Sequence, residues 1–206
     1  MTASLIAFTI AAALLTVTPG LDTALVLRTA TVEGPRRAAL AGLGICLGCL
    51  AWGLVVALGL GVLLEASELA YTILRWAGAA YLVYLGVKLI RSKRDGLIEE
   101  GVHESAGSGA AWFWRGLLTN LLNPKVGIFY VSFLPQFIPA DANVPGTTIL
   151  LAAIHAALGL AWFAALIVAT RPIAGALRRP STVRLLDRLT GGLFLLFGVR
   201  LALVRD

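Results

Sequence analysis

A proline and a lysine interrupt a long apolar stretch and mark the first place where chemistry is expected. Asn123, Pro124 and Lys125 lie near the middle of residues 116–138, a run with no other charged residue. A charge at the centre of such a run costs at least about 2.5 kcal/mol to insert into a bilayer, so it usually faces a cavity, a partner or a substrate. Proline breaks the helix and leaves polar backbone groups that hydrocarbon cannot satisfy. The simpler alternative is a kinked helix whose lysine reaches an interface.

A second interruption lies in the first apolar run, at Thr18-Pro19-Gly20-Leu21-Asp22. Thr18 is expected to cap the helix that begins after this break, and Pro19 suits the first position of that helix. Asp22 places a carboxylate at membrane depth, where ionisable residues usually mark functional sites. The two interruptions together therefore supply one carboxylate and one ammonium group.

This pair of charges suits a zwitterionic ligand. Helix N-termini offer backbone N–H groups and a positive dipole end to a carboxylate, and Lys125 adds a full positive charge. Asp22 offers the opposite charge to an ammonium group, while Thr18, Asn120 and Asn123 add neutral hydrogen-bonding groups. The alternative is a structural ion pair between Asp22 and Lys125 with no ligand between them. Because buried carboxylates and lysines can also carry protons, the two states could alternate during a cycle.

Membrane-spanning helices are the elements expected to position these residues. Hydrophobic residues make up 59% of the 206 positions and charged residues only 14%, and the mean hydropathy is +0.88, far from an average soluble domain. Apolar runs approaching the length that crosses a bilayer, about 20 residues, cover 2–27, 38–64, 69–90, 116–138, 147–170 and 189–204. The prediction is an all-α integral membrane protein of six transmembrane helices, the first and fourth broken. The net charge of +6 belongs to the connections, so nucleic acid is not expected as a partner.

The two halves of the chain share residues in the same order, which indicates an internal duplication. The matches recur at spacings of 112, 110 and 105 positions: Gly86-Val87-Lys88-Leu89 with Gly198-Val199-Arg200-Leu201, Leu50-Ala51-Trp52 with Leu160-Ala161-Trp162, and Pro19 with Pro124. Because each copy has three spans, the second copy must enter the membrane upside down. A 3+3 inverted repeat with broken helices at equivalent positions is typical of secondary transporters, whose site lies between the breaks.

The predicted domains are a first three-helix repeat at 1–90, a polar cytoplasmic linker at 91–111 and a second three-helix repeat at 112–206. Lys and Arg residues gather beside the first, third and fifth connections and outnumber those on the opposite side, Arg75, Arg200 and Arg205. Since basic connections stay in the cytoplasm, both termini are predicted on the non-cytoplasmic side. If the first run were not a span, the N-terminus would lie in the cytoplasm.

Other reactive residue types give weaker signals. Cys46 and Cys49 form a CxxC in a glycine-rich run that lacks a thioredoxin-like pattern, so a redox role is not favoured. Gly44 and Gly48 form a GxxxG in the same run, which predicts close packing of another helix. His155 either relays protons or packs in the bundle. No ligand cluster indicates a metal, and no motif indicates a cofactor, nucleotide binding or covalent catalysis, so an enzyme is not expected.

In combination the motifs resemble the LysE/RhtB translocators. They are Thr-Pro-Gly before an acidic residue in the first run, a basic Gly-Pro-Arg-Arg-Ala turn, Gly-Ala-Ala-Tyr-Leu-Val-Tyr-Leu-Gly in the third run, and Asn-Leu-Leu-Asn-Pro-Lys and Phe-Leu-Pro-Gln-Phe in the fourth. The resemblance covers nearly the whole chain. It implies a secondary transporter in the bacterial inner membrane that exports amino acids or close derivatives, is driven by the proton-motive force and forms a homodimer.

The resemblance also assigns a site. The residues that match the two family motifs, and that we expect to bind substrate, are Thr18, Pro19, Gly20, Asp22, Asn120, Asn123, Pro124 and Lys125. Proton coupling is assigned to Asp22 and Lys125. One departure from the family pattern is Leu21, where a second proline is common.

Two other cargo classes stay open. A cation or metal exporter of the same architecture is the alternative, since relatives in the wider superfamily move cations, although the ligand clusters that a metal needs are missing. A thiol-disulfide conduit would need reactive cysteines in both broken helices, whereas both cysteines lie in the second run. A single acidic residue does not favour a dibasic amino acid, and the apolar surroundings allow neutral or branched side chains.

Overall fold

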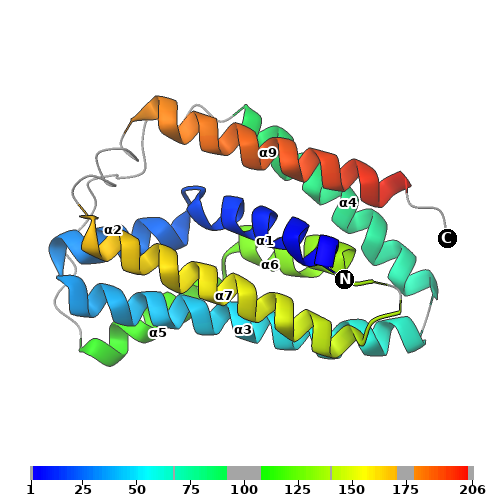
Figure 1. Cartoon of the computed structure of the whole chain (residues 1–206), viewed down its shortest axis with the longest axis horizontal. Coiled ribbons are helices and arrows are strands. Elements are labelled where there is room, and N and C mark those ends of the chain that lie inside the picture. Colours follow the sequence, from blue (N-terminus) through cyan, green and yellow to red (C-terminus); the bar gives the residue numbers. More distant parts are fainter. Residues whose placement is uncertain (1, 67, 92–107, 140, 171–178, 204–206) are drawn as a thin grey trace.

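The computed structural model describes residues 2–66, 68–91, 108–139, 141–170 and 179–203, which are almost entirely helical and contain no strand. The elements in chain order are α1 (Thr2–Val17), α2 (Leu21–Val32), α3 (Pro35–Ala66), α4 (Glu68–Ile90), α5 (Gly109–Leu121), α6 (Pro124–Ile128), the π-helical η1 (Phe129–Phe133), the 3-10 helical η2 (Leu134–Phe137), α7 (Val144–Val168) and α9 (Pro180–Leu203). Figure 1 shows these helices running roughly along one long axis. The predicted all-α class is confirmed.

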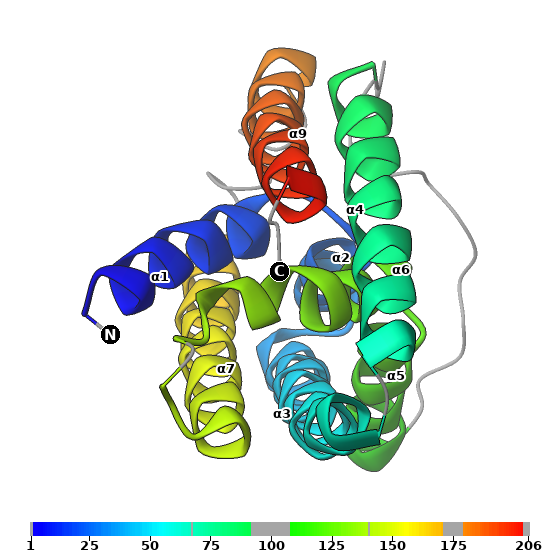
Figure 2. The same cartoon turned by 90° about the vertical axis from the view of Figure 1, so that its right-hand side faces the viewer.

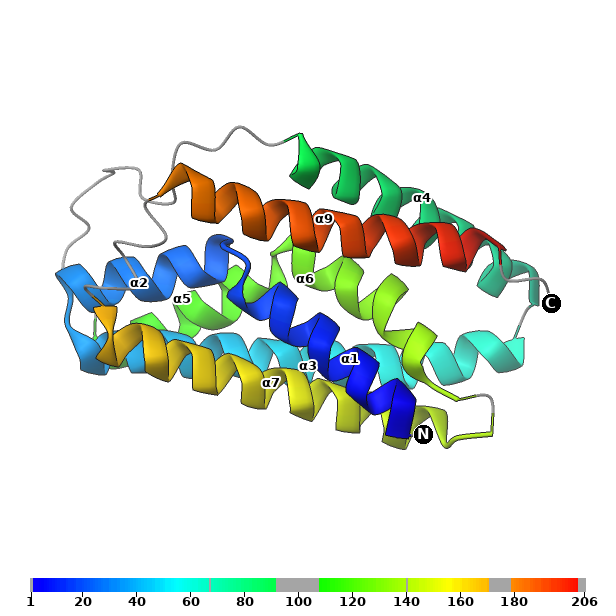
Figure 3. The same ribbon diagram turned by 45° about the horizontal axis from the view of Figure 1, so that its top comes forward.

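Two segments are long and apolar enough to cross a membrane by themselves, Pro35–Gly59 and Val144–Val168. Two further pairs of helices pass the same test only when joined: α1 with α2, and α5 with the segment that begins at α6. Each pair is bent by 51° at its break, and Figure 3 shows the turn of the chain between α1 and α2. Length and composition therefore support up to four spans among the described residues.

The first break does not follow the predicted capping pattern. Gly20, and not Thr18, is the N-cap of α2, and α2 begins at Leu21, so Pro19 is not its first residue. The Thr18 hydroxyl instead donates to the Leu14 carbonyl at 2.6 Å, which ties Thr18 to the end of α1. The prediction was wrong because the hydroxyl is already used by the helix that precedes it.

The second break follows the usual rules for the start of a helix. The Asn123 side chain accepts a hydrogen bond from the Lys125 backbone N–H at 3.1 Å, and Pro124 occupies the first turn of α6. Proline is well tolerated at this position because the N–H that it lacks would have no partner within the helix. The local sequence alone accounts for this break.

The helices form three groups. The α4 and α9 helices pack on each other, and α3 packs between α5 and α7. In the end-on view of Figure 2, α1, α2 and α6 lie between the α4–α9 pair and the α3–α7 pair. Thr18 of the first break and Asn120 and Asn123 of the second are buried, so each break turns polar side chains into the bundle.

Two helix boundaries differ from the prediction. The last helix begins at Pro180 and not at Leu189, and α5 begins at Gly109, inside the predicted linker at 91–111. The first turns of α9 bury Val183, Asp187 and Thr190, which lie on one helical face. Hydropathy missed these turns because Arg184 and Arg188, which are exposed, and Asp187, which is buried, all lower the average.

Close contact between α3 and α5 depends on glycines, as the GxxxG predicted. A Cβ atom on Gly44 would collide with the Phe113 backbone carbonyl, and one on Gly48 would lie 2.5 Å from the Asn120 Oδ1 atom. From the opposite helix, a Cβ atom on Gly116 would collide with the Ala41 carbonyl. The prediction of close packing is confirmed, and the contact also positions Asn120.

We expect Gly44→Ala to lower the stability of the protein by about 1–3 kcal/mol, because backbone atoms of α5 must move to admit the methyl group. Thermal unfolding in detergent would measure the change. The matched control is Gly59→Ala in the same helix, since nothing lies within 4 Å of a Cβ atom there. Equal melting temperatures for both variants would contradict the tight approach of α3 and α5.

Buried phenylalanines fill the core around η1 and η2, the two short helices that follow α6. Phe133 in η1 lies with its ring centroid 4.4 Å from Phe197 of α9, and Phe8 of α1 lies 5.4 Å from Phe137 of η2. The cluster joins α1, α9 and the segment that follows α6. These aromatic contacts hold the second broken segment against the rest of the bundle.

Candidate functional site

A cavity of about 50 Å³ lies where the two breaks meet. A volume of this size holds a few water molecules. The residues that the breaks contribute to its wall are Thr18, Gly20, Asp22, Asn120, Asn123 and Lys125. Pro19 and Pro124 are not among the described residues that line it, so their contribution is to interrupt the helices. Six of the eight residues singled out from the sequence thus surround one space.

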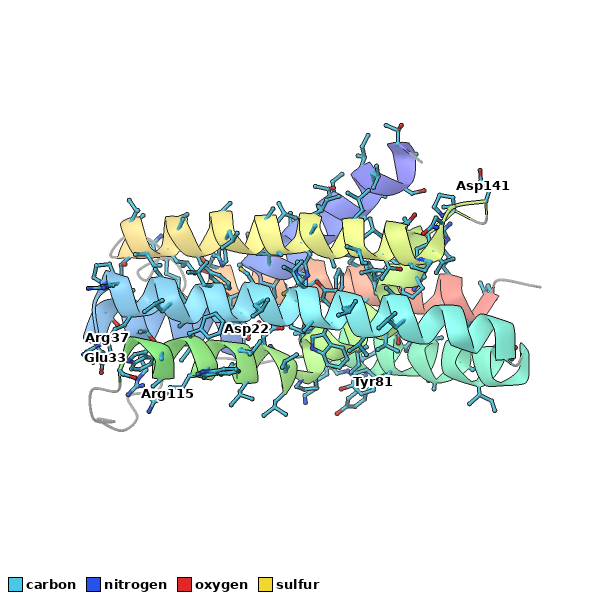
Figure 4. All side chains as sticks on the ribbon, turned by 90° about the horizontal axis from the view of Figure 1, so that it is seen from below. Asp22, Glu33, Arg37, Tyr81, Arg115 and Asp141 are labelled. Atoms are coloured by element: carbon cyan, nitrogen blue, oxygen red, sulfur yellow. The ribbon has the colours of Figure 1, made fainter. Side chains whose placement is uncertain are left out.

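Asp22 lies in the first turn of α2 and meets the second break. The Asn120 Nδ2 atom donates to Oδ2 of Asp22 at 2.9 Å, and the Asn123 Nδ2 atom donates to Oδ1 at 3.4 Å. In Figure 4, Asp22 lies inside the bundle, between the end that carries Glu33, Arg37 and Arg115 and the end that carries Asp141. Two amide groups from one half of the chain therefore hold the carboxylate of the other half.

Lys125 reaches the first break in the opposite direction. Its Nζ atom donates to the Leu15 carbonyl at 3.3 Å and to the Thr18 carbonyl at 3.2 Å. In an unbroken helix the Leu15 carbonyl would accept from residue 19, but Pro19 has no N–H. The ammonium group thus satisfies a carbonyl that the proline leaves open.

Gly20 lies beside the lysine at the first break. A Cβ atom at Gly20 would lie 3.6 Å from the Lys125 Nζ atom, an ordinary van der Waals contact. The backbone of Gly20 is extended, with φ of −157°, and it gives α2 no side-chain cap. The N-terminus of α2 therefore opens towards the cavity without a capping side chain.

Sequence reasoning missed several residues of the cavity wall. Cys46 and Cys49 of α3 line it with His155 and Phe163 of α7. The cysteines are three residues apart and so share a helix face, but this spacing gives no hint of which partner the face meets. The Asn120 Nδ2 atom also lies 3.5 Å from the Cys49 sulfur.

His155 has a defined partner in the second half of the chain. Its Nδ1 atom is hydrogen-bonded to the Tyr130 hydroxyl at 3.0 Å, and its ring lies 5.1 Å from that of Phe129. Both His155 and Tyr130 are buried. The packing interpretation therefore has direct support, and a role in proton relay stays a prediction.

Tyr130→Phe is expected to lower the stability by about 0.5–1.5 kcal/mol, because it removes the hydroxyl that pairs with His155 in the core. Thermal unfolding in detergent measures the difference. Tyr84→Phe is the control, since Tyr84 is exposed. A melting temperature that falls no further in Tyr130→Phe than in Tyr84→Phe would show that the buried hydrogen bond adds nothing.

Metal-binding side chains meet at this cavity without forming a site. Asp22, Cys46, Cys49 and His155 all contribute to its wall. Among the described residues, however, no three Asp, Glu, His or Cys side chains are placed so that they could hold one metal ion. Both cysteines are free thiols and are buried.

Comparison with known proteins gives consistent results. The family model described as LysE type translocator matches residues 13–205. The chain is 30% identical to the uncharacterized membrane protein YrhP of Bacillus subtilis, over 97% of this chain and 99% of the relative. It is 31% identical to a homoserine/homoserine lactone efflux protein of Salmonella typhi, over 97% of this chain and 96% of the relative.

A leucine efflux protein of Klebsiella pneumoniae is also 31% identical, over 71% of this chain and 69% of the relative. No solved structure matches. The matching family is one of translocators and not of enzymes. The chain belongs to the LysE type translocator family.

Proposed function

We propose that this protein is a secondary transporter that exports neutral amino acids or close derivatives across the bacterial inner membrane. The observation that carries the proposal is the meeting of the two breaks at one cavity, with a carboxylate and an ammonium group on its wall. The efflux proteins among the relatives are named for homoserine, its lactone and leucine, and homoserine and leucine are zwitterions with uncharged side chains. The likeness to these relatives supports the direction of transport.

The two charges suit the two ends of an amino acid. Asp22, oriented by Asn120 and Asn123, would bind the substrate ammonium group. Lys125 and the uncapped N-terminus of α2 would bind the substrate carboxylate. A cavity of about 50 Å³ is too small to hold a whole amino acid, so the site must open as cargo enters.

The rest of the wall favours an uncharged side chain. Its apolar members include Leu15, Ile45, Val126 and Phe163. Among the described residues of the wall, Asp22 is the only acidic one and Lys125 the only lysine or arginine. A dibasic or acidic cargo would bring an additional charge with no described partner, which is costly in a buried site.

Contacts between α4 and α9 support an inverted repeat. A Cβ atom on Gly86 would lie 2.7 Å from the Gly191 carbonyl, and one on Gly198 would lie 3.0 Å from the Ala79 carbonyl. The numbers of Gly198 and Gly86 differ by 112, as do those of Gly191 and Ala79. The Gly86–Gly191 contact and the Gly198–Ala79 contact are therefore equivalent, one made from each of two related copies. The pairing runs antiparallel, as a second copy inserted upside down requires.

Contacts between α3 and α7 repeat the pattern. A Cβ atom on Gly42 would meet Phe163, and one on Gly53 would meet Ala152. The residue numbers of Gly42 and Ala152 differ by 110, and so do those of Gly53 and Phe163. The two contacts are therefore again equivalent under the repeat. We infer six spans in a 3+3 inverted repeat, with the α1–α2 and α5–α6 pairs each acting as one broken span.

The remaining features stay proposals that rest on the sequence. The repeats at 1–90 and 112–206, the cytoplasmic linker at 91–111 and both termini outside the cytoplasm follow from the duplication and the basic connections. Figure 1 is compatible with this arrangement, because the start of α1 and the end of α9 both lie away from the turn between α2 and α3. Proton coupling through Asp22 and Lys125 and a homodimeric assembly are expectations from the family resemblance.

Efflux from proteoliposomes tests this function. Vesicles loaded with a panel of labelled neutral, dibasic and acidic amino acids would be assayed under an imposed proton gradient. We expect gradient-dependent efflux of neutral amino acids and little efflux of the charged classes. Equal efflux from vesicles without protein would overturn the transport function. Gradient-independent flux would overturn proton coupling alone, and export of a divalent metal but of no amino acid would favour the cation alternative.

A further inference from the structure

We propose that Thr190 of α9 is a positioning residue for the cargo site, acting through Thr18 on Lys125. The inference rests on the proposed transport function. It gives a role at the site to α9, none of whose described residues lines the cavity. Thr190 is wholly buried and Thr18 is 1% exposed. Their hydroxyl groups are hydrogen-bonded to each other across 172 positions of sequence.

The direction of this hydrogen bond follows from proton counting. A threonine hydroxyl has one proton to donate and two lone pairs to accept with. The Thr18 hydroxyl donates its proton to the Leu14 carbonyl at 2.6 Å. Thr190 must therefore donate to the Thr18 oxygen, so the side chain of Thr18 is held from two sides.

The same residue holds the lysine. The Thr18 backbone carbonyl accepts from the Lys125 Nζ atom at 3.2 Å. Thr18 lies directly after the end of α1 and before Pro19, where regular helical hydrogen bonding stops. Contacts to its side chain therefore set where this carbonyl points, and through it where the ammonium group is presented to the cargo.

A role in packing alone fits Thr190 less well. Several other buried or half-buried threonines donate to the carbonyl four residues earlier in their own helix, among them Thr9, Thr16 and Thr29. Thr190 instead bonds to a residue of the first break. A hydroxyl directed out of its own helix points to a contact that positions another element.

The contact is also present in only one half of the repeat. The position equivalent to Thr190, 112 residues earlier, is Gly78 in α4. Gly78 has no side chain, and a Cβ atom there would collide with the Ser132 hydroxyl. A contact needed only to pack the two copies would be expected in both. The Thr190 contact is found only at the first break, and the carbonyls that hold Lys125 belong to the same break.

The test is the concentration dependence of neutral amino-acid transport in proteoliposomes. Thr190→Val keeps the shape of the side chain and removes the hydroxyl. We expect its KM to rise about threefold to tenfold, the effect of losing one positioning hydrogen bond, with the maximal rate within about twofold of the parent. Thr190→Ser keeps the donor and should restore the parent KM, which a purely structural role for the methyl group would not do.

Thr29→Val is the matched control, because it removes a buried hydroxyl that bonds within its own helix. A KM for Thr190→Val equal to that of the parent, or raised no more than in Thr29→Val, would overturn the positioning role while leaving transport intact. If the parent itself moved no amino acid, the proposed function would fail, and the inference would fail with it. If Thr190→Val does not fold, Thr190→Ala replaces it in the test. A KM for Thr190→Ser that is no lower than the KM for Thr190→Ala would then overturn the inference.

Discussion

Asp22→Asn is expected to reduce efflux of neutral amino acids by about 100-fold or more. The substitution keeps the size of the side chain but removes the carboxylate that Asp22 alone contributes among the described wall residues. It also places an amide against the two amide donors of Asn120 and Asn123, so one acceptor oxygen is lost. Removing one partner of a buried charged contact commonly costs about 2–5 kcal/mol, which corresponds to this loss of transport.

The measurement is initial efflux at a fixed proton gradient, normalised to the amount of folded protein in the vesicles. Asp141→Asn is the matched control, because Asp141 is exposed at the far end of the molecule (Figure 4). We expect Asp141→Asn to transport as well as the parent. If Asp22→Asn transported at the parental rate, the ammonium site would lie elsewhere.

Lys125→Met is also expected to reduce efflux by about 100-fold, because it removes the proposed partner of the substrate carboxylate. Methionine has nearly the length of the lysine stem but cannot donate, so the Leu15 and Thr18 carbonyls lose this contact. The variant should therefore be less stable than the parent as well as inactive, by about 1–3 kcal/mol for the buried acceptors left unsatisfied. Lys88→Met in α4 is the control, since Lys88 is exposed.

The double variant Asp22→Asn with Lys125→Met separates a substrate site from a structural ion pair. If the two residues only neutralised each other, removing both charges would recover activity lost in each single variant. If each binds one end of the cargo, the double variant stays as inactive as the single ones. Recovery of efflux in the double variant would therefore contradict the proposed zwitterion site.

The sequence by itself determined the helical class and the position of both interruptions. These features are local, because proline removes a backbone donor wherever it stands and apolar runs of this length favour membrane helices. Asn123-Pro124-Lys125 predicted an interruption at this position, and the structure ends α5 before it and begins α6 at Pro124. Gly44 and Gly48 likewise predicted a close helix contact that α5 provides.

Local rules failed where a side chain had partners both near and far in sequence. Thr18 is an acceptable cap by residue type, yet its hydroxyl bonds backwards to Leu14 and across to Thr190. The start of α9 was missed for a related reason, since the packed face that includes Asp187 is visible only when the helix meets its neighbours. A residue's own type cannot say which of several competing partners it will meet.

Only the tertiary structure decided how the site is assembled. The sequence supplied one carboxylate and one lysine, but the amide groups that hold Asp22 come from about 100 positions away, and Lys125 bonds to carbonyls of α1. The tertiary structure also brought Cys46 and His155 to the same wall and joined α9 to the first break. Such pairings depend on how the helices pack against one another, because hydrogen bonds between distant segments form only after packing has fixed their separation and direction.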